Sequence, residues 1–567
     1  MPSTGRRRLS VGRPVALVLA LVLVVVVLGS GVLGARLAGV GPFHPTTPGA
    51  PHYVDETVAS GLHHVYGGGD TAMIGGGLAV FDCDNDGRPD IFVAGGDHPA
   101  ALFRNVSTRG GSLAFTQVQS PVTDLTGVMG AYPIDIDGDG NPDLVVLRVG
   151  GVDLLRGLGG CRFERANDTW GLQQPTGWEM AFSATWEGSN SLPTLAIGSY
   201  VGLDASGNET YTCAPPLLYR PVAGGSGYGA AIRLAPGYCP LSMLFSDWDG
   251  SGRRDLRIAN DRHYYAAQSA DQGEEQLWRI APGEAPRAYT AADGWKQLQL
   301  WGMGIASQDL NGDGLPEIYI TSQADNKLQT LANGPAQPTY RDIALQSGVI
   351  GTHPVNGGDP LPSTAWHPEF EDVNNDGIMD LYVSKGNIDQ MPDYASRDPS
   401  NLYIGQPGGT FTEQAAAAGI INYDHSRGAA LVDLNGDGLL DLVEVKVNAP
   451  MLVFRNVGAG TAAAPQAMGH WLGVSLQEAG GNRDGIGAVI EVRAGALDVR
   501  REVMVGGGHI SGQLGPTHFG LGDATSAEVR VEWPDGTWGP WQTTGADGVV
   551  TVNREPASIT EDPTFAP

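Results

Sequence analysis

Residues 135–143 read Asp-Ile-Asp-Gly-Asp-Gly-Asn-Pro-Asp, an acidic loop that runs directly into the apolar segment Leu144–Leu147. A degraded copy of this loop spans Thr185–Thr194 and precedes the strand-like Leu195–Gly198. Five further loops have the same spacing of acidic residues, and they begin at Asp82, Asp247, Asp309, Asp372 and Asp433. Successive loops begin 53, 50, 62, 62, 63 and 61 residues apart. We therefore infer seven repeats and number their loops 1 to 7, the degraded copy being loop 3.

Each repeat contains four short strand-like segments. In different repeats these are represented by Gly76–Phe81 before a loop, Asp143–Leu147 after one, and then Leu102–Asn105 and Phe411–Gln414. Four short strands in each of seven repeats predict an all-β fold, a seven-bladed β-propeller. Tyr53–Thr57 has the form of a fourth strand and Met451–Asn456 that of a third. We expect the first to complete the last blade, because such pairing removes two exposed edges.

The acidic loops have the chemistry of calcium ligands. Calcium takes six to eight oxygen atoms in irregular geometry. Side chains at loop positions 1, 3, 5 and 9 and the carbonyl of position 7 supply oxygens, and glycine at position 6 permits the sharp turn. Without a cation the clustered carboxylates would repel one another. Asp and Asn also favour turns without a metal, but this does not explain six loops of identical spacing.

The predicted ligand set comprises positions 1, 3, 5, 7 and 9 of six loops. The residues are Asp82, Asp84, Asp86, Arg88 and Asp90; Asp135, Asp137, Asp139, Asn141 and Asp143; Asp247, Asp249, Ser251, Arg253 and Asp255; Asp309, Asn311, Asp313, Leu315 and Glu317; Asp372, Asn374, Asp376, Ile378 and Asp380; and Asp433, Asn435, Asp437, Leu439 and Asp441.

The loops differ in expected strength. Loops 1 and 2 keep four carboxylates each, whereas loops 5, 6 and 7 carry Asn at position 3, which retains an oxygen but not a charge. Loop 4 has Ser251 at position 5 and is expected to bind weakly. Loop 3 has lost nearly every ligand and is expected to be empty, so its Glu187 should be dispensable. We expect about five or six calcium ions.

The N-terminus predicts export. Arg6, Arg7, Arg8 and Arg13 precede the 19-residue span Val15–Leu33, which is nearly all apolar and close to the length that crosses a bilayer. The basic residues hold this end in the cytoplasm, so the remainder is extracytoplasmic. We predict a membrane-anchored protein with a single N-terminal helix, the signal anchor; a cleaved signal peptide and secretion are the alternative.

From about His470 the acidic loops stop and short alternating strands continue, which indicates a small β-sandwich-like domain. The predicted segments are a cytoplasmic basic segment 1–14, the transmembrane anchor 15–35, a linker 36–51, the propeller 52–458, the β domain 468–555 and a disordered tail 556–567.

Four cysteines without a Cys-x-x-Cys pair favour disulfides in an exported protein. Cys213 and Cys239 bracket one segment rich in proline and glycine and form the favoured pair, which leaves Cys83 with Cys161. Four buried free thiols are the alternative.

Charge and motifs limit the function. The net charge of −28 disfavours nucleic acid and anionic lipid as partners, so we expect membrane contact only through the N-terminal helix. Metalloprotease, nucleophile-elbow and phosphate-loop motifs are absent from the sequence. His509 and His518 are interpreted as structural hydrogen-bonding residues, with a functional site as the alternative. We therefore predict no catalytic residues and no enzyme.

The loops and their flanking strands resemble the FG-GAP or VCBS repeats of integrin α-subunit propellers. Four later segments resemble the ASPIC/UnbV domain: Asn482–Ala488, Gly506–Ser511, His518–Gly522 and Val529–Gly536. The combination, covering about residues 53–555, is similar to the cartilage-acidic-protein family. This resemblance implies calcium binding, an extracellular or cell-adhesion role, and no known reaction.

We therefore expect an extracytoplasmic calcium-binding interaction or scaffold protein whose partner is an unidentified extracellular protein or glycan. The alternative is an exported enzyme, for example one acting on polysaccharide, that uses the propeller as a scaffold.

Overall fold

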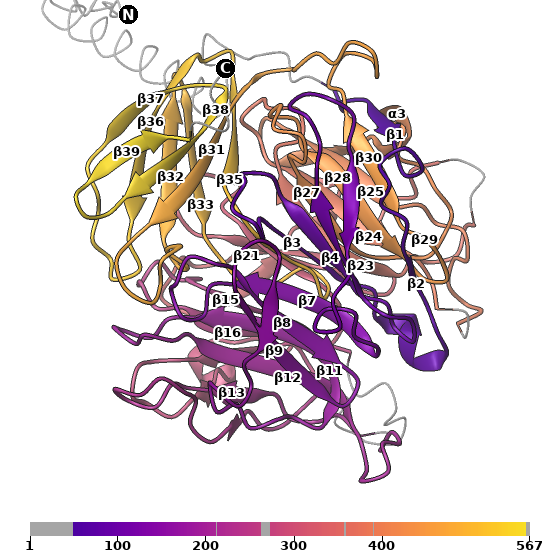
Figure 1. Cartoon of the computed structure of the whole chain (residues 1–567), viewed down its shortest axis with the longest axis vertical. Coiled ribbons are helices and arrows are strands. Elements are labelled where there is room, and N and C mark those ends of the chain that lie inside the picture. The colour runs from indigo at the N-terminus through magenta and orange to yellow at the C-terminus, as the bar shows by residue number, and fades with distance from the viewer. Residues whose placement is uncertain (1–48, 211, 262–272, 356–358, 389–390, 563–567) are drawn as a thin grey trace, which may run out of the picture. The chain divides into compact units, whose positions relative to one another are not determined.

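The computed structural model describes residues 49–567 except 211, 262–272, 356–358, 389–390 and 563–567. The described chain is all-β (Figure 1), and its helical segments are the short turns η1 (Asp70–Ile74), η2 (Ala291–Asp293), α2 (Ala344–Ser347) and α3 (Ala415–Ala418). The predicted anchor at 15–35 lies outside the described residues. Among those that are described, no helix has the length and apolar character needed to span a membrane.

Residues 53–456 form seven four-stranded antiparallel sheets, one for each predicted repeat. Listed in chain order from the strand that precedes each loop, the first six are β3 (Leu78–Phe81), β4 (Asp90–Val93), β5 (Ala101–Asn105), β6 (Phe115–Val118); β7 (Val128–Ile134), β8 (Asp143–Arg148), β9 (Gly151–Gly157), β10 (Phe163–Arg165); β11 (Gly177–Thr185), β12 (Thr194–Gly202), β13 (Leu217–Tyr219), β14 (Ile232–Arg233); β15 (Pro240–Ser246), β16 (Asp255–Asn260), β17 (Gln276–Arg279), β18 (Arg287–Ala288); β19 (Ile305–Gln308), β20 (Glu317–Ile320), β21 (Lys327–Leu331), β22 (Tyr340–Asp342); and β23 (Ala365–Glu371), β24 (Asp380–Lys385), β25 (Asn401–Gln406), β26 (Thr410–Glu413).

The seventh sheet joins the two ends of the series. It contains β27 (Ser426–Val432), β28 (Asp441–Lys446), β30 (Leu452–Asn456) and, as its outer strand, β1 (Tyr53–Asp55). Tyr53 lies opposite Asn456 and Asp55 opposite Phe454, which confirms that the N-terminal strand completes the last repeat. A further two-stranded pairing of β2 (Val65–Tyr66) with β29 (Ala449–Pro450) ties the same ends together.

The first strands of the seven sheets form a closed cycle of contacts. β3 contacts β7, β7 contacts β11, and the series continues through β15, β19 and β23 to β27, which contacts β3 again. Apolar residues from neighbouring sheets share common cores, so each sheet buries its faces against the next. This arrangement is consistent with the predicted propeller.

The C-terminal part forms two further four-stranded sheets around one core. One sheet contains β31 (His470–Gln477), β35 (Thr517–Gly522), β38 (Gly548–Asn553) and β39 (Ser558–Glu561), and the other contains β32 (Val489–Ala494), β33 (Leu497–Glu502), β36 (Ser526–Glu532) and β37 (Gln542–Gly545). Leu472, Ile490, Phe519, Val529 and Val550 belong to the shared core.

The tail prediction is wrong at residues 558–561. These residues form β39, which pairs with β38 from Val550↔Glu561 to Asn553↔Ser558. The physical reason is that Ile559 packs against the C-terminal core, an apolar contact that a disordered tail would lack.

Between β33 and β35 the chain leaves the C-terminal sheets and runs along the first strands of the repeats. Bridges join Val505 to β11, Gly506 to β15, Gly508 to β19 and Ser511 to β7, and β34 (Gly512–Leu514) adds to β3 as a parallel strand. The backbone of this segment comes so close to the first strands that only small residues fit there. A Cβ at Gly77 or Gly130 would lie 1.8 or 2.1 Å from the carbonyl oxygen of Ile510.

Candidate calcium-binding loops

All six intact loops fold around the carboxylate at position 1. This carboxylate accepts a hydrogen bond from the amide of the glycine at position 6, at 2.7–2.8 Å in every loop. In five loops the position 5 carboxylate accepts the amide of position 7 at 2.8–3.0 Å. The glycines at position 6 have positive φ, for example 85° at Gly140, a conformation that other residues adopt at a cost. The six loops therefore share one backbone frame.

The carboxylate at position 9 links each loop to the sheet behind it. Asp143 begins β8, is fully buried, and accepts the amide of Ile136 at 2.7 Å and that of Gly157 in β9 at 2.8 Å. Asp90, Asp380 and Asp441 make the equivalent pair of bonds in loops 1, 6 and 7. Only the strand register of the sheets can place this acceptor, so the ligand frame depends on the fold.

Burial makes ionisation of the clustered carboxyl groups unfavourable. Burial, with a contribution from neighbouring carboxylates, raises the pKa of Asp143 to about 8, that of Asp90 to about 7 and that of Asp135 to about 6. Burial, and then the charges of Asp372 and Asp376, raise the pKa of Asp380 well above its ordinary range. A bound cation would reverse this penalty by supplying positive charge next to the buried carboxylates.

The carboxylate oxygens of loops 1 and 2 are spaced closely enough to share one calcium ion. Carboxylate oxygens of Asp82, Asp84 and Asp86 lie within 4.8 Å of one another, as do those of Asp135, Asp137 and Asp143. Two oxygens bound to one calcium ion at 2.3–2.6 Å can be at most about 5 Å apart. Among the described residues, Asp84 Oδ1, Asp376 Oδ2 and Asp437 Oδ2 are buried without a hydrogen-bond partner. Buried oxygens without a donor are the expected state of ligands that await a cation.

Arginines that the loop pattern did not identify lie beside the position 3 carboxylates of loops 1 and 2. Arg156 contacts Asp137 at 2.6 Å and Asp139 at 2.7 Å, and Arg104 lies 3.7 Å from Asp84. Both arginines occupy the third strand of their repeat, so a repeated arginine in that strand was an available signal. A bound cation would share these carboxylates with the guanidinium groups.

Loop 4 contains a positive charge of its own. The guanidinium of Arg253 lies 2.9 Å from Asp255 and 3.4 Å from Asp249. Arg253 occupies position 7, where the prediction uses only the backbone carbonyl. Arg88 at position 7 of loop 1 pairs with Asp86 in a similar way, so the arginine does not distinguish loop 4, and Ser251 remains the reason to expect weak calcium binding here.

Loop 3 is held by an ion pair instead. Glu187 accepts two hydrogen bonds from Arg220, at 2.7 and 2.8 Å, and a third from the Thr194 hydroxyl at 2.7 Å. Arg220 follows β13, more than thirty residues from Glu187, so no local pattern reveals the pair. Contrary to the sequence-based expectation, Glu187 makes buried interactions that a truncation would remove.

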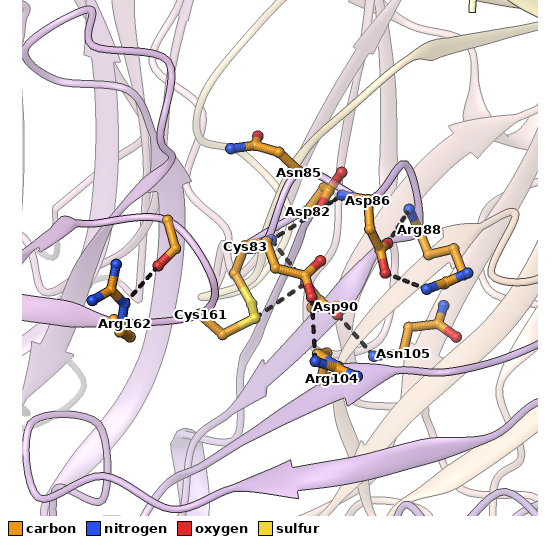
Figure 2. Close-up of a disulfide and its surroundings, with 12 residues drawn as sticks. Asp82, Cys83, Asn85, Asp86, Arg88, Asp90, Arg104, Asn105, Cys161 and Arg162 are labelled. Carbon is orange, nitrogen blue, oxygen red and sulfur yellow. Dashed lines mark hydrogen bonds and ion pairs between the residues drawn. A yellow bond between two sulfur atoms is a disulfide. The ribbon is translucent and has the colours of Figure 1, made fainter. Parts of the chain in front are cut away.

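A disulfide joins loop 1 to the second sheet (Figure 2). Cys83 at loop position 2 is bonded to Cys161 in the β9–β10 turn, and Cys213 is bonded to Cys239, so both predicted pairs are confirmed. The amide of Cys83 donates to Asp90 at 2.8 Å, and the amide of Cys161 donates to the Cys83 carbonyl at 2.9 Å. The disulfide therefore braces the position 9 ligand of loop 1.

The two C-terminal histidines make structural contacts. His509 Nε2 lies 2.8 Å from the carbonyl of Ile74, and His518 Nε2 lies 2.6 Å from Asn375 Oδ1. Burial lowers the pKa of each histidine to about 3, so both rings are neutral at physiological pH. This supports the structural interpretation of both residues.

Family models match two parts of the chain. A model described as FG-GAP-like repeat matches residues 82–146 and 309–383. A model described as ASPIC and UnbV matches residues 478–559. The matched ranges include loops 1, 2, 5 and 6 and most of the C-terminal sheets.

Proteins named cartilage acidic protein 1 are similar to this chain. Cartilage acidic protein 1 of Xenopus tropicalis is 23% identical over 492 residues, which cover 81% of this chain and 70% of that protein. The mouse protein of the same name is 28% identical over 237 residues, covering 39% of this chain and 33% of that protein. These names describe no reaction.

Solved structures give weaker matches. The structure of BBS1N in complex with ARL6DN aligns with 74% of this chain and all of that chain, at 10% identity and a TM-score of 0.40. AofleA of Arthrobotrys oligospora aligns with 60% of this chain and 85% of its own, at 9% identity and a TM-score of 0.33. Scores this low support no argument about this chain.

The chain thus contains segments that match FG-GAP-like repeats and an ASPIC and UnbV domain, and it is similar to cartilage acidic protein 1 of Xenopus tropicalis over most of its length.

Proposed function

We propose that this chain is an extracytoplasmic, calcium-binding interaction protein built on a seven-bladed propeller, without catalytic activity. The observation that carries the proposal is the frame shared by six loops, in which buried carboxylates converge and some of their oxygens have no donor. Calcium neutralises such a site and accepts its irregular oxygen geometry. Two disulfides and the named relatives support a location outside the cytoplasm.

Loops 1, 2, 5, 6 and 7 are the proposed strong sites, loop 4 is weak, and loop 3 carries its internal ion pair in place of calcium. The calcium ions serve to hold the repeats in register, since each position 9 ligand is bonded to the sheet behind it. The partner is an extracellular protein or glycan, and the predicted N-terminal helix provides membrane attachment.

The test is a thermal scan of the full chain with calcium and with chelator. If the sites have dissociation constants of roughly 0.1–1 mM, as in other extracellular modules, calcium at ten times that value stabilises by about 1.4 kcal/mol per site. Five sites then contribute about 7 kcal/mol, comparable to the whole stability of a typical domain. Chelation should lower the melting temperature by many degrees.

One pair of variants assigns the effect to the loops. Asp135→Ala together with Asp137→Ala should remove one site's share, whereas Asp168→Ala in an exposed turn should have no effect on the calcium dependence. Identical melting curves with calcium and with chelator would refute the proposal.

A further inference from the structure

The C-terminal sheets rest on two neighbouring candidate loops, 6 and 7. His518 of β35 is hydrogen-bonded to Asn375 of loop 6 at 2.6 Å, and Asn375 donates in turn to the carbonyl of Gly438 in loop 7 at 2.9 Å. Trp471 of β31 stacks on His518 with ring centroids 6.0 Å apart. A Cβ added to Gly438 would lie 1.9 Å from the Trp471 indole nitrogen, so the indole ring packs directly on the backbone of loop 7.

Loop 6 is the more deeply covered of the two. Gly520 of β35 faces its first ligand so closely that a Cβ there would lie 2.0 Å from Asp372 Oδ2. Leu497 packs on Gly377 in the same way. Arg501 forms a two-bonded ion pair with Glu371, the residue before Asp372, with a shortest contact of 2.5 Å. These residues come from β33 and β35 and together form a lid over the loop.

The lid leaves loop 6 almost without solvent. Asp372 and Asp376, at positions 1 and 5, are buried, whereas Asp82 and Asp86 at the same positions of loop 1 are only half-buried. Asp376 Oδ2 is buried without a hydrogen-bond partner. The amide of Asp376 donates to Asp372 Oδ1 at 3.1 Å, so the two residues are joined within the loop. A buried carboxylate oxygen without a donor, in a loop of acidic side chains, is the chemistry of a cation ligand.

Without a cation, docking of the lid must desolvate the Asp372 carboxylate in the same loop as the buried Asp376 and Asp380. The lid's Arg501 is already engaged with Glu371, so its charge is largely balanced by that carboxylate. Burying several like charges without compensation is strongly unfavourable. Calcium would remove most of this cost, and the docked lid would in turn block release of the ion.

We propose that loop 6 is a closed calcium site whose lid is the C-terminal domain, so that calcium occupancy of this loop and docking of the domain are coupled. The inference rests on the proposed calcium function and adds that one site controls how the two parts of the chain are joined. Coupling of this kind is reciprocal, since the factor by which calcium favours docking equals the factor by which docking favours calcium.

The first test compares Asp372→Asn in loop 6 with Asp82→Asn in loop 1, the same position in a loop without this lid. Hydrogen exchange of the β35 amides in the full chain reports docking, and calcium titration counts the sites. In calcium, Asp372→Asn should speed β35 exchange by between about 5-fold and 150-fold, the usual range of such coupling. Asp82→Asn should lose one site and leave β35 protected. Chelation of the wild-type chain should reproduce the effect of Asp372→Asn.

A second variant leaves every carboxylate in place. Gly520→Ala adds a methyl group that must displace the lid from Asp372, and Gly545→Ala is its control because a Cβ there meets nothing within 4 Å. Gly520→Ala should weaken one calcium site by between about 5-fold and 150-fold, whereas Gly545→Ala should leave all sites unchanged.

The outcomes separate the two proposals. If calcium binds but Asp372→Asn and Asp82→Asn affect β35 exchange equally, or neither affects it, the coupling is refuted and calcium binding stands. Normal calcium binding by Gly520→Ala with β35 still protected would refute it as well. If the wild-type chain binds no calcium, the proposed function fails and the coupling fails with it.

Discussion

Loop 3 provides the sharpest test of how these loops are held, because there an internal ion pair stands in for the metal. The Glu187 and Arg220 side chains are 6% and 19% exposed, and the carboxylate accepts two bonds from the guanidinium. Removing one member of a buried pair costs about 3–5 kcal/mol because the other charge is left uncompensated. We expect Glu187→Ala to fall near the lower limit, about 3 kcal/mol, since Arg220 also donates to the carbonyl of Ala281 and keeps some contact with water.

The measurement is urea unfolding of the full chain, followed by circular dichroism, in calcium and again in chelator. The loss should be the same in both, because the guanidinium and not calcium balances Glu187. Arg220→Ala should cost a similar amount, and the double variant should cost clearly less than the sum of the two single variants. Glu164→Ala is the control, since this side chain is 55% exposed.

A change below about 0.5 kcal/mol for Glu187→Ala, the size typical of surface substitutions, would refute the role of the ion pair. A loss that appears only in calcium would instead mean that loop 3 binds the metal.

Three further perturbations follow from the same contacts. Cys83→Ser with Cys161→Ser should lower stability by about 2–4 kcal/mol and weaken calcium binding at the braced loop 1; unchanged unfolding and unchanged calcium titration would contradict this. In chelator the folded state binds protons more tightly than the unfolded chain, because the Asp143 pKa is raised from 3.8 to about 8. Its contribution to stability is therefore greatest at low pH and is lost as pH rises toward 8, so the melting temperature should be higher at pH 5 than at pH 9, and saturating calcium should remove this difference. Glu56→Gln removes half of a buried ion pair with Arg455 at 2.8 Å, which ties the N-terminal strand to the last repeat, and should cost about 3 kcal/mol in urea unfolding; an unchanged midpoint would show that β1 does not need this pair.

The local sequence pattern was sufficient to predict the repeats and the strand pairing that completes the last repeat. Loop spacing identified six loops that share one frame, and the strand-like forms of Tyr53–Thr57 and Met451–Asn456 predicted their pairing. Such features are readable because each depends on residues close in sequence, where side-chain alternation and turn chemistry act. The Cys213–Cys239 pair was likewise suggested by a single short segment.

Tertiary structure decided which charges compensate the loop carboxylates and which residues bury the loops. Nothing near Glu187 indicates Arg220, and nothing near Asp372 indicates Gly520, because these partners are brought together only when separate sheets pack. The position of the segment around Ile510 was not predictable either. It packs against the first strands of the repeats, and the sequence shows only that these strands are rich in small residues. Sequence therefore determined where the candidate ligands of each loop are. The packing of distant segments determined which loops receive an arginine from another strand, which are open to solvent and which are closed, since burial and charge compensation depend on the neighbours in space.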